Sequence, residues 1–202
     1  MSSQENDTIK QGNLLRDKGD LDGAIAAYTE SISLDAPNAE AYCGRARVYA
    51  EKGEFDRAIT DCTEAIRLNP EYADAYAGLA YSYGKKGEFD RAIIDCTEAI
   101  RLNPEYVEAY RGRASSYAEK GEFDRAITDI NEAIRLAPEP SRVYSNRAWI
   151  YIKKGCLDEA IADYTEAIRL APGYAEAYHS RGYLYDDKGD CNKAIADFTE
   201  AI

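Results

Sequence analysis

The chain has 202 residues, of which 45% are hydrophobic and 31% charged, and this composition excludes a disordered chain because it is ample for a packed core. Its 37 acidic residues outnumber 25 basic ones and give a net charge of −12. Such a field repels phosphate backbones and anionic lipids, so we expect neither a nucleic-acid nor a membrane partner.

A period of 34 residues runs through the sequence. Glycine recurs at that spacing from Gly19 to Gly189, and alanine does so from Ala24 to Ala194. The period defines six units, at approximately residues 5–38, 39–72, 73–106, 107–140, 141–174 and 175–202, the last one truncated. A repeat of this length indicates a supersecondary unit that is stable only when stacked on its neighbours, so we predict a single array over residues 1–202.

Each unit carries the local signals of two helices, as residues 73–106 illustrate. Residues 73–86 place apolar side chains at the i, i+3, i+4, i+7 spacing of one helical face. Gly87 ends this helix, since a residue without Cβ adopts the left-handed conformation at little cost. Asp90 is expected to cap a second helix, which Pro104 prevents from continuing. The same cap position holds Asp22, Asp56, Asp124, Asp158 and Asn192 in the other units.

The repeating residues also follow a recognisable order, which in the third unit is Tyr76, Ala80, Tyr83, Gly87, Ala92, Ala99 and Pro104. This order, with its period of 34, resembles the tetratricopeptide repeat. Cys62, Cys96 and Ile130 replace the aromatic residue that the family places before the second alanine. The resemblance implies an all-α, right-handed superhelical solenoid of antiparallel helix pairs. In such a solenoid the first helices line a concave groove that binds peptides or partner proteins, and the protein is not an enzyme.

The copies differ most at three positions of the first helices, which by this resemblance face the groove. The positions hold Cys43, Ala77, Arg111, Ser145 and His179; then Arg47, Tyr81, Ser115, Trp149 and Tyr183; and then Gly44, Gly78, Gly112, Asn146 and Ser180. The candidate peptide-binding residues are Arg47, Tyr81, Arg111, Ser115, Arg142, Asn146, Trp149, His179 and Tyr183. Drift at exposed positions explains the same variation equally well.

The single tryptophan, Trp149, is expected to lie among Arg111, Arg142, Asn146 and His179. An aromatic anchor with cationic and amide neighbours is typical of an interface hot spot, so we expect it to accept an acidic side chain or a terminal carboxylate. The Lys/Asn/Asn/Lys/Arg clamp by which some tetratricopeptide repeats grip terminal carboxylates is not matched in either half of the sequence.

Three glycines lie inside predicted first helices, at Gly44, Gly78 and Gly112. Each costs roughly 0.5–1 kcal/mol relative to alanine in a helix. We therefore expect a close backbone approach at these positions.

No residue constellation points to catalysis or to a cofactor. The cysteines Cys43, Cys62, Cys96, Cys156 and Cys191 form no CxxC motif and have one histidine to join them, so we expect no metal site. Their odd number and scatter favour small buried side chains in a reducing cytosol. The spacings of Arg57 with Asp61 and of Glu64 with Arg67 are typical of ion pairs on a solvated helix face.

The remaining signals bear on location and function. No apolar run approaches the ~20 residues that span a bilayer, and the first residues do not resemble a signal segment, which favours a soluble cytoplasmic protein. The leading function is a non-enzymatic scaffold that binds a peptide or partner protein in its groove. The alternatives are head-to-tail self-association through near-identical units and an uncapped last helix, and, less favoured, a docking fragment of a larger enzyme or regulator.

Overall fold

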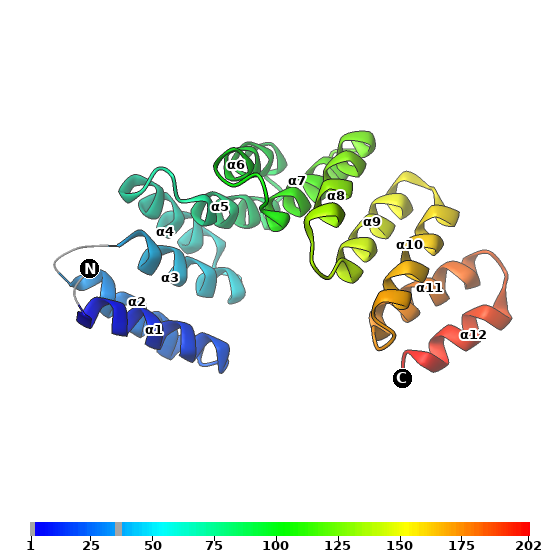
Figure 1. Ribbon diagram of the computed structural model, residues 1–202, viewed down its shortest axis with the longest axis horizontal. Helices are drawn as coiled ribbons and strands as arrows, with labels where there is room; N and C mark the ends of the chain where they lie inside the picture. Colours follow the sequence, from blue (N-terminus) through cyan, green and yellow to red (C-terminus); the bar gives the residue numbers. More distant parts are fainter. Residues whose placement is uncertain (1–2, 35–37) are drawn as a thin grey trace. The chain divides into compact units, whose positions relative to one another are not determined.

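The computed structural model describes residues 3–34 and 38–202, where the chain forms helices joined by short turns (Figure 1). In chain order the helices are α1 (Ser3–Asp17), α2 (Leu21–Ser33), α3 (Ala39–Glu51), α4 (Phe55–Leu68), α5 (Ala73–Lys85), α6 (Phe89–Leu102), α7 (Val107–Glu119), α8 (Phe123–Leu136), α9 (Ser141–Lys154), α10 (Leu157–Leu170), α11 (Ala175–Asp187) and α12 (Cys191–Glu200). Each predicted repeat corresponds to one antiparallel pair, from α1/α2 to α11/α12. These pairs, called here the first to the sixth, confirm the all-α prediction.

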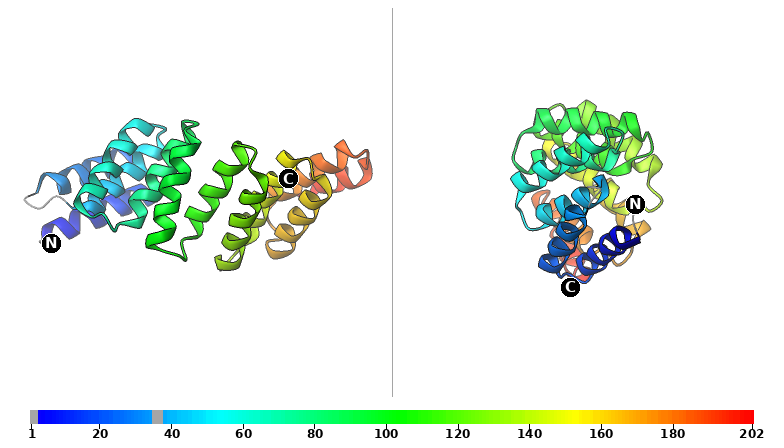
Figure 2. Two further views of the ribbon diagram at one scale, coloured as in Figure 1. Left: turned by 90° about the horizontal axis from the view of Figure 1, so that it is seen from above. Right: turned by 90° about the vertical axis from the view of Figure 1, so that its left-hand side faces the viewer.

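The chain divides into two compact units, Met1–Pro104 with the first three pairs and Glu105–Ile202 with the last three. In each unit the pairs pack on one another in chain order (Figures 1 and 2). In the first unit α2 packs on α3 and α4 on α5, while α1, α3 and α5 also contact one another in succession. In the second unit α8 packs on α9 and α10 on α11, and α7 also contacts α9. Clusters of buried apolar side chains therefore span the contacts between neighbouring pairs within a unit.

Small residues line the contacts between helices, as the repeats predict. The recurring alanine of the second helices is buried in all six pairs, at Ala24, Ala58, Ala92, Ala126, Ala160 and Ala194. Alanine is buried in the first helices as well, for example at Ala80 and Ala114. Because alanine keeps helix axes close, larger side chains such as Tyr28 and Ile130 fill the remaining space and are fully buried.

Glycine has two separate roles. The glycines that follow the first helices, Gly19, Gly53, Gly87, Gly121, Gly155 and Gly189, have φ angles between 77° and 83°, which confirms the predicted left-handed helix ends. Inside α3 and α5, in contrast, a Cβ on Gly44 would lie 2.6 Å from Tyr28 Cε1, and one on Gly78 would lie 2.7 Å from Cys62 Sγ. The close approach is made by side chains of the preceding second helix and not by backbone, which corrects the prediction.

The predicted caps of the second helices are wrong by two residues. Asp20 caps α2 by accepting a hydrogen bond from the Gly23 amide at 3.0 Å, and Asp190 caps α12 in the same way. The predicted caps Asp22, Asp56, Asp124 and Asp158 lie in the first helical turn instead, and they form ion pairs with Lys52, Lys86, Lys154 and Lys188 at the end of the following first helix. These pairs link successive helix pairs, although solvent screens them.

A buried ion pair joins the two helices in four of the six pairs. Arg45 on α3 donates through Nε and Nη2 to both carboxylate oxygens of Asp61 on α4, at 2.7 and 2.8 Å. The same two-pronged bond joins Arg113 to Asp129, Arg147 to Asp163 and Arg181 to Asp197. All four aspartates are buried, so the guanidinium group neutralises a carboxylate that is largely shielded from water.

The bond between Arg45 and Asp61 shows that one of the two predicted surface pairs is wrong. Asp61 does not pair with Arg57 on a solvated face, because Asp61 is buried and Arg57 donates to Glu54 at 2.6 Å. The pair of Glu64 with Arg67 is confirmed, with an N–O distance of 2.6 Å. The spacing of i, i+4 alone did not distinguish a surface contact from a buried one.

Other chemistry is sparse in residues 3–34 and 38–202. None of the helices described there is long and apolar enough to cross a membrane, and no group of three or more His, Cys, Asp or Glu side chains there is arranged to hold a metal ion. The five cysteines are free, and Cys43, Cys62 and Cys96 are buried. Burial raises the pKa of the Cys43 thiol to about 11 and also raises the pKa of Cys62, so neither forms a reactive thiolate at neutral pH.

Candidate functional site

Seven of the nine candidate residues lie in the second unit, on the first helices of its three pairs. Their spacings of three or four residues place them on one side of each helix. We call this set the α7/α9/α11 face; it consists of Arg111 and Ser115 on α7, Arg142, Asn146 and Trp149 on α9, and His179 and Tyr183 on α11.

Arg111 and Asn146 form the direct contact between α7 and α9 on this face. The Arg111 Nε donates to Asn146 Oδ1 at 2.9 Å. The nearest carboxylate oxygen, of Glu108, lies 3.9 Å from Nη1, which is too far for a strong hydrogen bond. Asn146 therefore orients the guanidinium group while its Nη atoms keep donor capacity for a ligand.

Trp149 has a cation above its ring. The Lys153 Nζ lies 4.8 Å from the ring centroid and 2.9 Å from Glu119 Oε2 on α7. Trp149 itself is partly buried. The Trp149, Lys153 and Glu119 side chains thus form a second bridge between α7 and α9, one to two turns along from the bond between Arg111 and Asn146.

His179 and Tyr183 belong to an aromatic cluster on the sixth pair. The His179 and Tyr183 ring centroids are 4.7 Å apart in an edge-to-face arrangement, and Phe198 on α12 lies 5.3 Å from Tyr183 and 5.8 Å from His179. Tyr183 is 55% exposed. Edge-to-face rings favour each other modestly, so the cluster presents a rigid and partly apolar surface.

Of the residues predicted around Trp149, Arg111 and Asn146 are in contact with each other. Ser115, Arg142 and His179 are exposed, and within residues 3–34 and 38–202 neither Arg142 nor His179 hydrogen-bonds to Trp149. The Ser145 hydroxyl is buried and has no hydrogen-bond partner in that part of the chain. The cation that lies over the tryptophan ring is Lys153, which the sequence reasoning had not selected.

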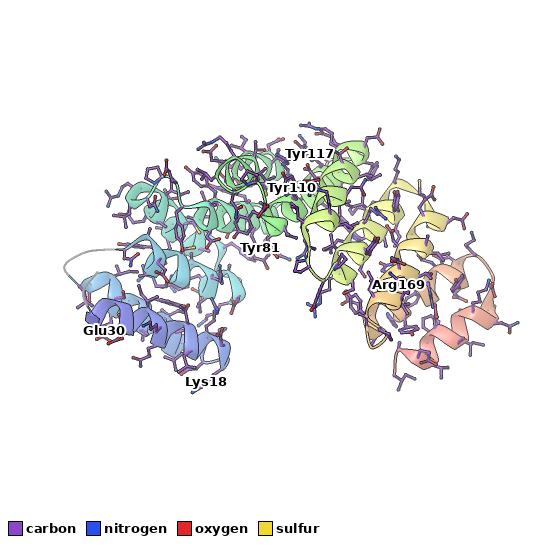
Figure 3. All side chains as sticks on the ribbon, in the orientation of Figure 1. Lys18, Glu30, Tyr81, Tyr110, Tyr117 and Arg169 are labelled. Carbon is purple, nitrogen blue, oxygen red and sulfur yellow. The ribbon has the colours of Figure 1, made fainter. Side chains whose placement is uncertain are left out.

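The other two candidates, Arg47 on α3 and Tyr81 on α5, lie in the first unit and are exposed. Tyr81 is 52% exposed and projects from the side of α5 that is turned away from α6 (Figure 3). Its ring lies 6.5 Å from Phe55, and the Lys85 Nζ lies 5.4 Å from its centroid. Cys43, which shared the variable groove position with Arg111, is buried and forms no part of an exposed surface.

The spacing along each helix would have predicted Lys85 and Lys153, which the sequence analysis did not include. Lys85 follows Tyr81 by four residues, and Lys153 follows Trp149 by four, so each aromatic ring has a cation one turn further along the same helix. Glu119 and Phe198 carry no comparable local signal, because each reaches the face from another helix.

The fold defines an α-helical tandem-repeat protein whose chemistry is that of exposed aromatic and charged side chains. A model of the TPR repeat matches residues 12–53, and models of the tetratricopeptide repeat match residues 39–72, 78–140, 112–175 and 145–202. The chain belongs to the tetratricopeptide repeat family. Proteins of this family are typically protein–protein interaction scaffolds and are generally not enzymes.

Solved structures of tetratricopeptide repeat proteins resemble the chain over most of its length. TTC0263, a thermophilic TPR protein of Thermus thermophilus, is 25% identical with a TM-score of 0.78, and the match covers 89% of this chain and 98% of that one. The MamA protein is 30% identical with a TM-score of 0.67, over 87% and 96%. YrrB, described as a TPR protein with an unusual peptide-binding site, is 23% identical with a TM-score of 0.62, over 87% and 91%. No curated protein sequence matches the chain.

Proposed function

We propose that the protein is a non-enzymatic scaffold that binds a peptide or a partner protein on the α7/α9/α11 face. The observation that carries the proposal is the pair of bridges between α7 and α9, where Arg111 is held by Asn146 and Lys153 lies over Trp149. Side chains that are already held in place lose little entropy on binding, which is a property of interface hot spots.

The charges of this face favour an acidic ligand. The Nη atoms of Arg111 have donor capacity, and Arg142 adds an exposed cation at the start of α9. The negative charge of Glu119 is balanced by its ion pair with Lys153. A carboxylate of the partner would gain charge-assisted hydrogen bonds from Arg111, and an apolar side chain beside it would cover the Trp149 ring. Ser115, His179 and Tyr183 would contact the rest of the ligand.

Arg47 and Tyr81 offer a smaller surface of the same kind in the first unit. Lys85 lies over Tyr81 as Lys153 lies over Trp149. We therefore extend the proposal to a second contact region there. The five free cysteines support the expected cytoplasmic location, because an oxidising compartment favours disulfides.

Pull-down experiments with the whole chain as bait, read by mass spectrometry, test the proposal. We expect Trp149→Ala and Arg111→Glu each to weaken capture of the same partner at least about tenfold, or ~1.4 kcal/mol. Arg135→Glu is the matched charge reversal, since Arg135 is exposed on α8 and pairs with Glu132 of the same helix. Capture by both face variants at the wild-type level, with unchanged helicity, would contradict the proposal.

Self-association is the second candidate, and the exposed side of α12 favours it. Ile195 is 64% exposed, whereas the equivalent residues Ile25, Ile59, Ile93, Ile127 and Ile161 are all partly buried. A second copy could cover this surface with its first pair. Sedimentation over a range of concentrations distinguishes this function, because a chain that stays monomeric at the highest concentration does not assemble through α12.

A further inference from the structure

In three of the four buried ion pairs the arginine contacts three helices rather than two. Besides its two bonds to Asp61, Arg45 donates through Nη1 to Thr29 on α2 at 2.9 Å. Arg147 reaches Asn131 on α8 in the same way, and Arg181 reaches Thr165 on α10. The guanidinium group therefore lies between two successive second helices and satisfies an acceptor on each of them.

The third pair keeps the acceptors of this arrangement and lacks the donor. Leu79 on α5 occupies the position of Arg45, while Asp95 on α6 occupies that of Asp61, and Thr63 on α4 occupies that of Thr29. The first pair has neither charge at these two positions, because Gln11 and Ala27 stand there. Among the six repeats, the third alone has the aspartate without the arginine.

Asp95 has no internal substitute for the missing arginine. Leu79 is 8% exposed and packs in an apolar cluster with Cys62, so it offers no hydrogen bond. Asp95 has no hydrogen bond or ion pair in the part of the chain that the structure describes, and it is only partly buried, unlike the four paired aspartates. The arginines at the equivalent position of the other repeats keep 14% to 22% of their side chains exposed, and in the third pair Thr63 is exposed and Asp95 partly exposed, so solvent reaches both acceptors.

The nearest cation, Arg91, is engaged by other groups and does not bond to Asp95 in the described part of the chain. Arg91, one turn before Asp95, is bonded to Glu88 at 2.7 Å and lies over the Tyr83 ring at 5.2 Å. Burial raises the pKa of Asp95 to about 6, although the charge of Arg91 lowers it in part. At neutral pH the Asp95 carboxylate is therefore charged. Burial disfavours that charge, and a bonded cation would stabilise it.

Thr63 supplies the second half of the site. Its hydroxyl donates to the Ile59 carbonyl oxygen at 2.7 Å, as the Thr165 hydroxyl donates to Ile161 at 2.7 Å. Thr165 also accepts the hydrogen bond from Arg181. Thr63 retains the same acceptor capacity, since a hydroxyl has two lone pairs.

We propose that Asp95 and Thr63, on neighbouring second helices of the first unit, bind an arginine side chain of a partner polypeptide. The incoming guanidinium group occupies the place that Arg45, Arg147 and Arg181 fill from within the chain. Arginine fits better than lysine because its planar group donates two parallel hydrogen bonds to one carboxylate and a third to another acceptor. This site is separate from the α7/α9/α11 face and does not depend on it.

Carboxyl-detected NMR on the whole chain tests the proposal with acetyl-arginine methylamide as the probe. We expect a saturable shift of the Asp95 carboxyl carbon and of the Thr63 methyl group. Leu79→Arg is the matched control, because it keeps Asp95 and supplies the internal arginine of the other repeats; there the probe should shift neither group. Asp95→Asn should abolish the Thr63 shift.

Two comparison compounds keep the test independent of the variants' folding. Acetyl-citrulline methylamide has nearly the same shape without the charge, so it should produce no saturable shift. Acetyl-lysine methylamide, with a free side-chain amine, should bind more weakly than the arginine compound. Absence of a shift with the arginine compound, an equal shift in Leu79→Arg, or an equal shift with the citrulline compound would each overturn the proposal.

Discussion

At the residue scale, the buried arginine and aspartate of a helix pair act as one unit. Arg147 is bonded to Asp163 and lies over the Tyr144 and Tyr151 rings, with its guanidinium carbon 5.3 and 5.9 Å from their centroids. Removing one partner of a buried pair leaves the other charge uncompensated, at a cost of about 3–5 kcal/mol. Removing both partners costs less, since the first pair of helices folds with Gln11 and Ala27 instead.

A double-mutant cycle on this pair checks that argument. We expect Arg147→Gln alone to lower the free energy of unfolding by about 3 kcal/mol, because it leaves Asp163 buried without a cation. Adding Asp163→Ala should recover about 1 kcal/mol or more of that loss. Urea denaturation of the three variants measures the coupling. Simple addition of the two single effects would show that the residues are independent.

Substitution of Asp95 should raise the free energy of unfolding, whereas substitution of Arg147 should lower it. Burial raises the folded-state pKa of Asp95 from 3.8 to about 6, so the folded state binds the extra proton between these values. The contribution of the neutral Asp95 carboxyl group to the free energy of unfolding is fully present below about pH 4. It is lost as the pH rises through about 6. Asp95→Asn removes this cost, so we expect stability at about pH 7.5 to rise by about 1 kcal/mol, after allowing for solvent screening.

Thermal unfolding of the Asp95→Asn variant at two pH values measures this effect. The gain over the wild type should be present at about pH 7.5 and vanish at about pH 4, where Asp95 of the wild type is largely neutral. Asp61→Asn is the control, because it disrupts the bond to Arg45 and should destabilise the chain at about pH 7.5. Equal effects of the two substitutions would contradict the distinction between a paired and an unpaired aspartate.

At the element scale, local sequence signals predicted the helices well. The positions of Gly87 and Pro104, and the apolar spacing of residues 73–86, act within a few residues of one another, so they predicted the ends of α5 and α6 closely. The caps were misplaced because Asp56 and Asp22 resemble caps in isolation. Their position within the first turn depends on where the preceding glycine turn ends.

Contacts between helices were harder to predict. Arg45 and Asp61 are 16 residues apart, and their bond depends on how α3 and α4 pack. The reason for Gly44 also comes from another helix, since the Tyr28 ring occupies the space of a Cβ. A residue type and a spacing indicate a face of a helix, but the partner across the interface follows only once both helices are in place.

The buried alanines allow a matched test within α10. Ala160 is fully buried, whereas Ala162, two residues later, is exposed. Ala160→Leu should overpack the contact between helices and lower the free energy of unfolding by about 1–3 kcal/mol. Ala162→Leu should change it by less than about 0.5 kcal/mol. Chemical denaturation compares the two, and equal effects would show that close helix contact does not limit size at Ala160.

At the scale of the whole molecule, each pair depends on its neighbours for stability. The sixth pair contacts one neighbour, and Ile195 on α12 is far more exposed than Ile161 on α10. We expect amide hydrogens of α12 to exchange about tenfold faster than those of α10. Hydrogen–deuterium exchange with mass spectrometry of the 202-residue chain measures both. Equal exchange rates in a dilute monomeric sample would contradict the expectation.

The candidate site was only partly predictable for the same reason. The sequence selected Arg111, Asn146 and Trp149, and the structure places Arg111 and Asn146 in contact. It did not select Lys153 or Glu119, whose importance depends on the bridge between α7 and α9. Whether these residues bind a partner stays a prediction, because the fold provides a surface without specifying its ligand.

The single tryptophan has a practical consequence for spectroscopy. Trp149 lies in the fifth pair, partly buried beneath Lys153, so its fluorescence reports on the second unit. Emission should change when a ligand covers the ring or when α9 unfolds. The first unit has tyrosines but no tryptophan. An arginine ligand at Asp95 would therefore leave the tryptophan emission unchanged, and the two proposed binding events can be followed separately in one sample.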